Sequence, residues 1–152
     1  MKKIKDFTER PIEYNELENT NEYRSFMKWM PKYADGICLS LTGLEYSEFG
    51  ESKWGFLKDS VTGYEYTVES PVTRGPEVLL LYMKTDNVTS RFLRSRENIY
   101  DFMDPMIIKR DYIYLYDLCL VRGGKLELCS CSHERFCYIS RAMLNAYKNK
   151  LQ

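Results

Sequence analysis

The residues with the greatest capacity for chemistry in this chain lie in one short stretch, CSCSHERFC, at positions 129–137. The stretch contains three of the five cysteines and the only histidine. Thiolate and imidazole groups are common zinc ligands, and a cysteine beside a histidine can serve as an activated nucleophile. The stretch therefore raises two chemical hypotheses, a metal site and a thiol enzyme.

The spacing of these residues limits the metal hypothesis. On an extended strand, side chains two positions apart are separated by about 6.6 Å and those four apart by about 13 Å, whereas zinc–ligand bonds are about 2.0–2.3 Å long. Cys129 and His133 then cannot share an ion. Cys131, His133 and Cys137 could share one only if the chain folds back after His133. That three-ligand site is kept as an alternative, and we otherwise expect no cofactor.

A thiol enzyme would have to use His133, because the chain has no second histidine. Cys131 precedes it by two positions, and Cys137 could reach it only through the fold. Neighbours on an extended strand give poor geometry for proton transfer, and a lone histidine is more often structural than catalytic. We therefore favour a non-enzymatic function and keep Cys131, His133 and Cys137 as the alternative thiol site.

Length and composition limit the class of protein. The 152 residues suit a single compact domain over 1–152, and no repeat or linker divides them. A net charge of zero and a pI near 6.6 argue against a strong non-specific polyanion binder. The longest apolar run, 78–83, is too short to cross a bilayer, and the N-terminal residues lack the apolar segment of a signal peptide. Five cysteines without such a segment favour a reducing compartment, so we expect a cytoplasmic protein with no membrane partner.

The cluster belongs to a predicted hairpin. Residues 112–121, YIYLYDLCLV, form the clearest strand in the chain, and residues 125–132, KLELCSCS, return beside it across Gly123 and Gly124. Alternation from that turn predicts two surfaces. One is expected to be the core and carries Ile113, Leu115, Cys119, Val121, Leu126 and Leu128, with Asp117 among them. The other carries Tyr112, Tyr114, Tyr116, Leu118, Leu120, Glu127, Cys129, Cys131 and His133.

Periodicity and capping residues predict the remaining elements. Apolar residues at helical spacing indicate one helix near 21–30 with Asn21 as its cap, one over 87–104 ended by Pro105, and one after Ser140. Strands are expected at 37–43 and 77–84, and as a pair with a turn near 59–63. This order favours an α+β fold: a mainly antiparallel sheet with the C-terminal hairpin 112–121 and 125–132, and two to three helices packed on it.

The functional prediction depends on tyrosine, of which the chain has 13. Tyrosine supplies a large, rigid contact area and is frequent at protein-binding surfaces, although it can also cap an ordinary sheet. We expect Tyr112, Tyr114 and Tyr116, with Trp29 and Met30 of the first helix, to bind another protein. The predicted function is a small protein-binding protein that acts stoichiometrically as an inhibitor or neutraliser, of the toxin-immunity or phage anti-defence type.

Nucleic acid is the alternative partner. Arg91 and Arg94 share one side of the second predicted helix, and Lys109 and Arg110 follow it closely. Clustered basic residues of this kind bind phosphate groups. Because Glu97 and nearby aspartates dilute the positive charge, nucleic-acid binding is the alternative and not the main expectation.

Overall fold

A computed structural model describes residues 6–69, 74–108 and 111–150 of the chain. Its strands are β1 (Ile12–Glu13), β2 (Gly36–Thr42), β3 (Val61–Glu69), β4 (Arg74–Lys84), β5 (Asp104–Ile108), β6 (Asp111–Arg122), β7 (Lys125–Cys131) and β8 (Phe136–Ile139). All eight belong to one sheet in the order β1-β8-β7-β6-β2-β4-β3, with β5 paired to β6 outside this path. Every paired set of these strands is antiparallel.

The α-helices are α1 (Thr20–Trp29), α2 (Tyr46–Phe49), α3 (Asn87–Arg94) and α4 (Arg141–Asn149), and the 3-10 helices are η1 (Glu16–Glu18), η2 (Met30–Lys32) and η3 (Gly55–Ser60). Ser140 caps α4 as predicted, because its hydroxyl accepts the Met143 N–H at 3.0 Å. The cap of α1 is Asn19, which accepts the Glu22 N–H, and not the predicted Asn21. No helix in the described ranges combines the length and the apolarity that crossing a bilayer requires.

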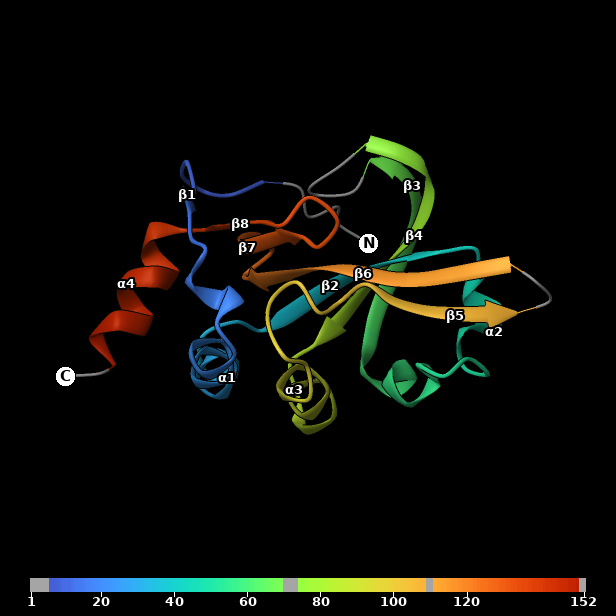
Figure 1. The fold of residues 1–152 in the computed structure, drawn as a ribbon, viewed down its shortest axis with the longest axis horizontal. Helices are drawn as coiled ribbons and strands as arrows, with labels where there is room; N and C mark the ends of the chain where they lie inside the picture. The colour runs from blue at the N-terminus through green and yellow to red at the C-terminus, as the bar shows by residue number, and fades with distance from the viewer. Residues whose placement is uncertain (1–5, 70–73, 109–110, 151–152) are drawn as a thin grey trace.

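The helices cover one face of the sheet, which confirms the predicted α+β fold. In Figure 1, α1 and α3 lie next to each other below the strands, and α4 lies beyond the end of β8. Phe26, Phe92 and Tyr147 from these helices pack with Leu39 and Leu118 of the sheet in the main core. Each of these side chains is almost fully removed from water, so this layer supplies most of the apolar burial that stabilises the fold.

A second, smaller apolar cluster lies on the opposite face, here called the helix-free face. It consists of strand residues alone: Cys38, Val78, Leu80, Tyr82, Cys119, Val121, Leu126 and Cys129. Phe7, from the segment before β1, packs on this cluster, and so does Tyr116 of β6. Both faces of the central strands are therefore buried, and their sequences are nearly continuous apolar runs.

The β6–β7 hairpin has the predicted turn but not the predicted register. Arg122 pairs with Lys125 across two glycines with positive φ angles, 58° at Gly123 and 79° at Gly124, as a tight two-residue turn requires. Val121 is opposite Leu126, but Leu120 is then opposite Leu128. Glu127 is therefore an extra residue in β7, and the alternation predicted from the turn is displaced by one position beyond it, so that Cys119 pairs with Cys129.

A second bulge lies in β6 at Asp117, which has a φ of 55°. Cys38 of β2 is opposite Cys119 while Ser40 is opposite Tyr116, so β6 contains one residue more than β2 in this interval. One extra residue inverts the alternation of a strand. The two predicted surfaces are therefore wrong: Leu118 and Leu120 join Ile113 and Leu115 in the helix-covered core, while Cys119, Val121 and Leu126 lie on the helix-free face.

Two other predicted elements differ from the structure. Residues 55–60 form η3, so a single long strand, β3, follows where two strands with a turn were predicted. Helix α3 ends at Arg94, ten residues before the predicted stop, and Pro105 lies inside β5. Among the described residues β5 pairs only with β6, and such an edge position tolerates a proline.

Candidate functional site

The sheet forks along one edge of β6. On that edge β5 pairs with residues 111–115 of β6, and β7 pairs with residues 119–122. In the gap, the Ser130 hydroxyl donates to the Leu118 carbonyl and the Ser132 N–H donates to Asp117 Oδ1, both at 2.8 Å. These two contacts replace strand pairing at the bulge and hold the fork open beside Asp117.

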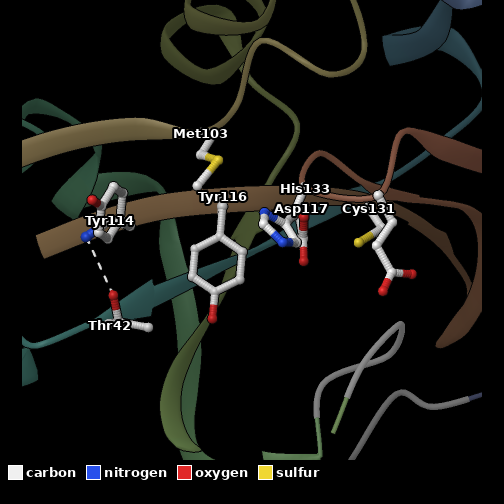
Figure 2. Close-up of a pocket in the computed structure, with 8 residues that line it drawn as sticks. Thr42, Met103, Tyr114, Tyr116, Asp117, Cys131 and His133 are labelled. Atoms are coloured by element: carbon white, nitrogen blue, oxygen red, sulfur yellow. Dashed lines mark hydrogen bonds between the residues drawn. The ribbon is translucent and has the colours of Figure 1, made fainter. Parts of the chain in front are cut away.

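A cavity of about 260 Å³ occupies this fork (Figure 2). It is lined by Thr42, Met103, Tyr114, Tyr116, Asp117, Cys131, His133 and Glu134. Asp117, His133 and Cys131 lie close together toward one end, and Tyr114 and Thr42 lie toward the other. The cavity therefore joins two groups of residues that the sequence singled out separately, part of the tyrosine row and part of the Cys/His cluster.

Asp117 is the cavity residue with the most unusual environment. Asp117 is only 3% exposed, and the predicted alternation of the hairpin put it on the core surface without a function. Burial raises the pKa of Asp117 to about 6, although the Ser132 N–H and the nearby His133 partly oppose this effect. Burial of an ionisable carboxyl group costs free energy, and so does a positive φ at a residue other than glycine. Positions that combine such costs are typical of functional sites.

The structure does not assemble the three residues of the metal and thiol alternatives. Cys131 lines the cavity, whereas Cys137 is fully buried in the helix-covered core. Burial raises the pKa of both thiols, so neither is a thiolate nucleophile at neutral pH. Within the described ranges no group of three or more His, Cys, Asp or Glu residues could hold a metal ion.

Beside the cavity lies an exposed apolar surface, here called the β5–β6 surface and made of Met103, Pro105, Ile107, Tyr112 and Tyr114. Ile107 is directly opposite Tyr112 and Pro105 is directly opposite Tyr114 in the β5–β6 ladder, so these side chains share one face. Ile107 is 62% exposed, Tyr112 61% and Met103 48%. The rings of Tyr112 and Tyr114 are stacked, with centroids 6.1 Å apart.

The first helix does not extend this surface. Met30 has no exposed area and belongs to the main core, so its predicted part in partner binding is wrong. Trp29 is half-buried and stacks on Tyr33 with ring centroids 5.4 Å apart. It packs against the helix-covered core, on the other side of the sheet from the cavity-lining Tyr116.

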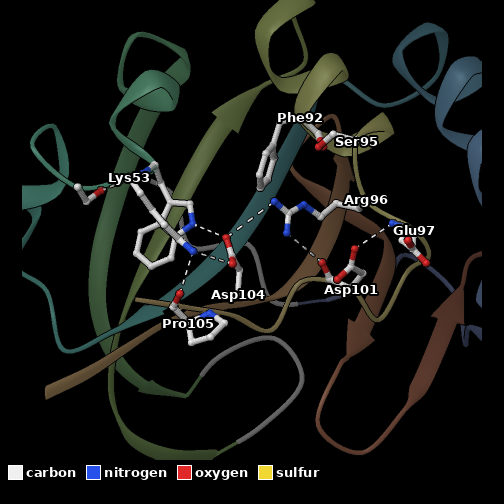
Figure 3. Close-up of polar contacts among 10 residues, drawn as sticks. Lys53, Phe92, Ser95, Arg96, Glu97, Asp101, Asp104 and Pro105 are labelled. Carbon is white, nitrogen blue, oxygen red and sulfur yellow. Dashed lines mark hydrogen bonds and ion pairs between the residues drawn. The ribbon is translucent and has the colours of Figure 1, made fainter. Parts of the chain in front are cut away.

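The start of β5 is held by a polar network around Asp104 (Figure 3). Lys53 Nζ lies 2.8 Å from Asp104 Oδ1, and the Trp54 indole N–H donates to Asp104 Oδ2 at 2.9 Å. Burial alone would raise the pKa of Asp104, but the hydrogen bonds from Lys53 and Trp54 outweigh it and lower the pKa. Arg96 lies on the other side, 3.8 Å from the same carboxylate, and stacks on Phe92. This network positions Met103 and Pro105, which flank Asp104 in the chain.

The basic residues of the nucleic-acid alternative are only partly described. Arg91 and Arg94 lie exposed in the last turn of α3, and the Arg94 Nε–H donates back to the Ser90 carbonyl at 3.3 Å. Lys109 and Arg110 lie outside the described residues.

Comparisons with known proteins give no information on the function of this site. No family model matches the chain, and neither the curated proteins nor the solved structures include a match. A proposal for the function of the chain therefore depends on the geometry of the cavity and of the β5–β6 surface.

Proposed function

We propose that this chain is a protein-binding protein and that the β5–β6 surface is its contact with the partner. The observation that carries the proposal is the pair Ile107 and Tyr112, which lie directly opposite each other with 62% and 61% of their area exposed. Large apolar side chains that adjoin on a surface are typical of interaction sites, and tyrosine and methionine are enriched there.

Contacts within the chain hold part of this surface in place, which favours affinity. Tyr112 and Tyr114 are stacked on each other, and the Tyr114 N–H donates to Thr42 Oγ1 at 3.3 Å. The Asp104 network fixes the beginning of β5. A surface that is already ordered loses less conformational entropy when it docks.

The biological role that we propose is inhibition or neutralisation of the partner, of the toxin-immunity or phage anti-defence type. A domain of 152 residues covers the partner surface beneath it when it binds. Because that covering is sufficient to block a site, one bound copy per partner is sufficient for inhibition.

A pull-down from native extract with nuclease treatment tests the proposal. The tagged wild-type chain should retain one protein at near-equal stoichiometry, and the double variant Ile107→Ser/Tyr112→Ala should lose it. Val68→Ser is the matched control, because Val68 is a β-branched residue that is 55% exposed on the other edge strand, β3. All variants must first show a cooperative thermal transition.

Two results would contradict the proposal. Retention of the partner by the folded double variant would show that the β5–β6 surface is not the contact. Loss of the retained material on nuclease treatment would instead support the nucleic-acid alternative and direct attention to Arg91 and Arg94.

A further inference from the structure

We propose that the cavity at the fork binds the guanidinium group of an arginine side chain that the partner inserts beside the β5–β6 surface. The source of this arginine rests on the proposed function. The cavity itself can be tested without any partner.

Asp117 is the acidic group best placed to hold a cation in this cavity. Its side chain is 97% buried, since only 3% of it is exposed, and it forms part of the cavity wall. Oδ1 accepts the Ser132 N–H at 2.8 Å. The Ser132 N–H is the donor that the described residues supply to this carboxylate, and Oδ2 is not among their fully buried polar atoms without a partner. A largely buried carboxylate that lines a cavity can accept a strong, charge-assisted hydrogen bond from a cationic donor placed in that cavity.

The chemistry of the cavity walls favours a guanidinium group. Tyr114, Tyr116 and Met103 supply apolar and aromatic surface, and the acidic residues Asp117 and Glu134 also line the cavity. A guanidinium group stacks on aromatic rings and pairs with carboxylates, whereas an ammonium group is compact and strongly hydrated. Two carboxylates also disfavour any anionic ligand.

The size of the cavity suits a single side chain. The cavity measures about 260 Å³, below the range of about 300–1,000 Å³ that is typical of sites for drug-sized ligands. It adjoins the β5–β6 surface, because Met103 and Tyr114 belong to both. A side chain that projects from a partner docked on that surface would enter the cavity directly. Arginine is also among the residues that most often dominate binding energy at interfaces.

The charge of the site depends on pH. The ionisable groups around Asp117 are Tyr116 and Cys119 on β6, Cys131 at the end of β7, and His133 and Glu134 in the following turn. Burial raises the pKa of Tyr116 and Cys131, and a hydrogen bond with Cys129 together with burial raises that of Cys119, so these three stay neutral near pH 7. Affinity for a cation should therefore increase as pH rises from 5 to 8, because Asp117 loses its proton over this range.

The experiment is an NMR titration of the full chain with n-butylguanidinium, an analogue of the arginine side chain. At pH 7.5 the amide signals of Asp117, Ser132 and His133 should shift with a dissociation constant in the millimolar range, as a probe of so few atoms allows. The neutral isostere n-butylurea should bind about tenfold more weakly or not at all. Asp117→Asn should remove the guanidinium effect, while Val68→Ser, on the edge strand β3 at the other side of the sheet, should leave it unchanged.

The outcomes separate this inference from the proposed function. Equal binding of n-butylurea, or unchanged binding by a folded Asp117→Asn variant, would overturn the arginine site. Tighter binding of n-butylamine would also overturn it, in favour of lysine. If n-butylguanidinium does not bind while Ile107→Ser/Tyr112→Ala still loses the partner, the arginine site is refuted and the proposed function stands. If the probe binds while that double variant keeps the partner, only the proposed function falls.

Discussion

Replacement of Asp117 by asparagine should stabilise the protein at neutral pH. Burial raises the pKa of this carboxyl group from its ordinary value of 3.8 to about 6. Each pKa unit corresponds to about 1.4 kcal/mol, so ionisation of Asp117 costs the folded state about 3 kcal/mol. An asparagine side chain has the same shape, can accept the Ser132 N–H and tolerates a positive φ.

The sign of the pH dependence follows from the direction of this shift. Between pH 3.8 and about 6 the folded protein holds a proton on Asp117 that the unfolded chain has already released. The stabilisation from the neutral carboxyl group is therefore complete below pH 3.8 and is lost as pH rises through 6. The free energy of unfolding of Asp117→Asn should exceed that of the wild type by about 3 kcal/mol at pH 8, and the two should be equal at pH 3.

Urea unfolding followed by circular dichroism from pH 3 to pH 8 measures this difference. The quantity to compare is the free energy of unfolding of the variant minus that of the wild type, because all other titrating groups then cancel. Asp59→Asn is the control. Asp59 is exposed, so this variant makes the same chemical substitution at a carboxyl group that water already solvates. A variant less stable than the wild type at pH 8 would refute the argument that the buried charge is costly.

Three further predictions concern the caps, the turn and the thiols. Asp86→Ala should cost about 1–2 kcal/mol at pH 7, because Asp86 accepts the Thr89 N–H at 2.9 Å and the Ser60 hydroxyl at 2.6 Å. Burial opposes ionisation of Asp86, but these hydrogen bonds outweigh it and lower its pKa, so the loss measured by urea unfolding should shrink below pH 3.8. Gly124→Ala should lower the free energy of unfolding by about 1 kcal/mol through its φ of 79° alone, since an added Cβ would contact nothing, and an unchanged urea midpoint would contradict this. Iodoacetamide should label all five cysteines of the native protein slowly at pH 8, as measured by mass spectrometry, because all five are buried. One thiol that reacts fast would instead support the thiol-enzyme hypothesis.

The elements that the sequence predicted well depend on residues close together in the chain. Gly123 and Gly124 determine the hairpin turn because both have positive φ angles. Ser140 determines the start of α4 through a contact three residues away. Such local interactions follow from residue type and spacing, so periodicity and capping rules found them.

The two bulges could not be predicted in the same way. Their positions at Asp117 and Glu127 follow from how β6 meets β2 and how β7 meets β6, which no single strand reveals. Each bulge inverts the alternation, so an otherwise correct hairpin was assigned wrong faces. Asp117 was nevertheless visible as an ionisable residue in the middle of the apolar strand YIYLYDLCLV, which is where the alternation breaks.

The half of the site contributed by β5 was missed for a related reason. Pro105 suggested the end of a helix, because helical apolar spacing precedes it, whereas the structure makes it the second residue of an edge strand. The contacts that fix this strand join Lys53 to Asp104 over 51 positions of the chain. No short-range pattern contains that information, so Ile107 and Met103 appeared as candidates only in the structure.

Photo-crosslinking in living cells tests the central claim most directly. A photoreactive phenylalanine analogue would be placed at Ile107 in one variant and at the similarly exposed Val68 in the other. If the β5–β6 surface contacts the partner, illumination should link position 107, and not position 68, to a single protein in a one-to-one adduct. Adducts of equal yield from both positions, or an adduct from position 68 alone, would contradict a binding surface on β5 and β6.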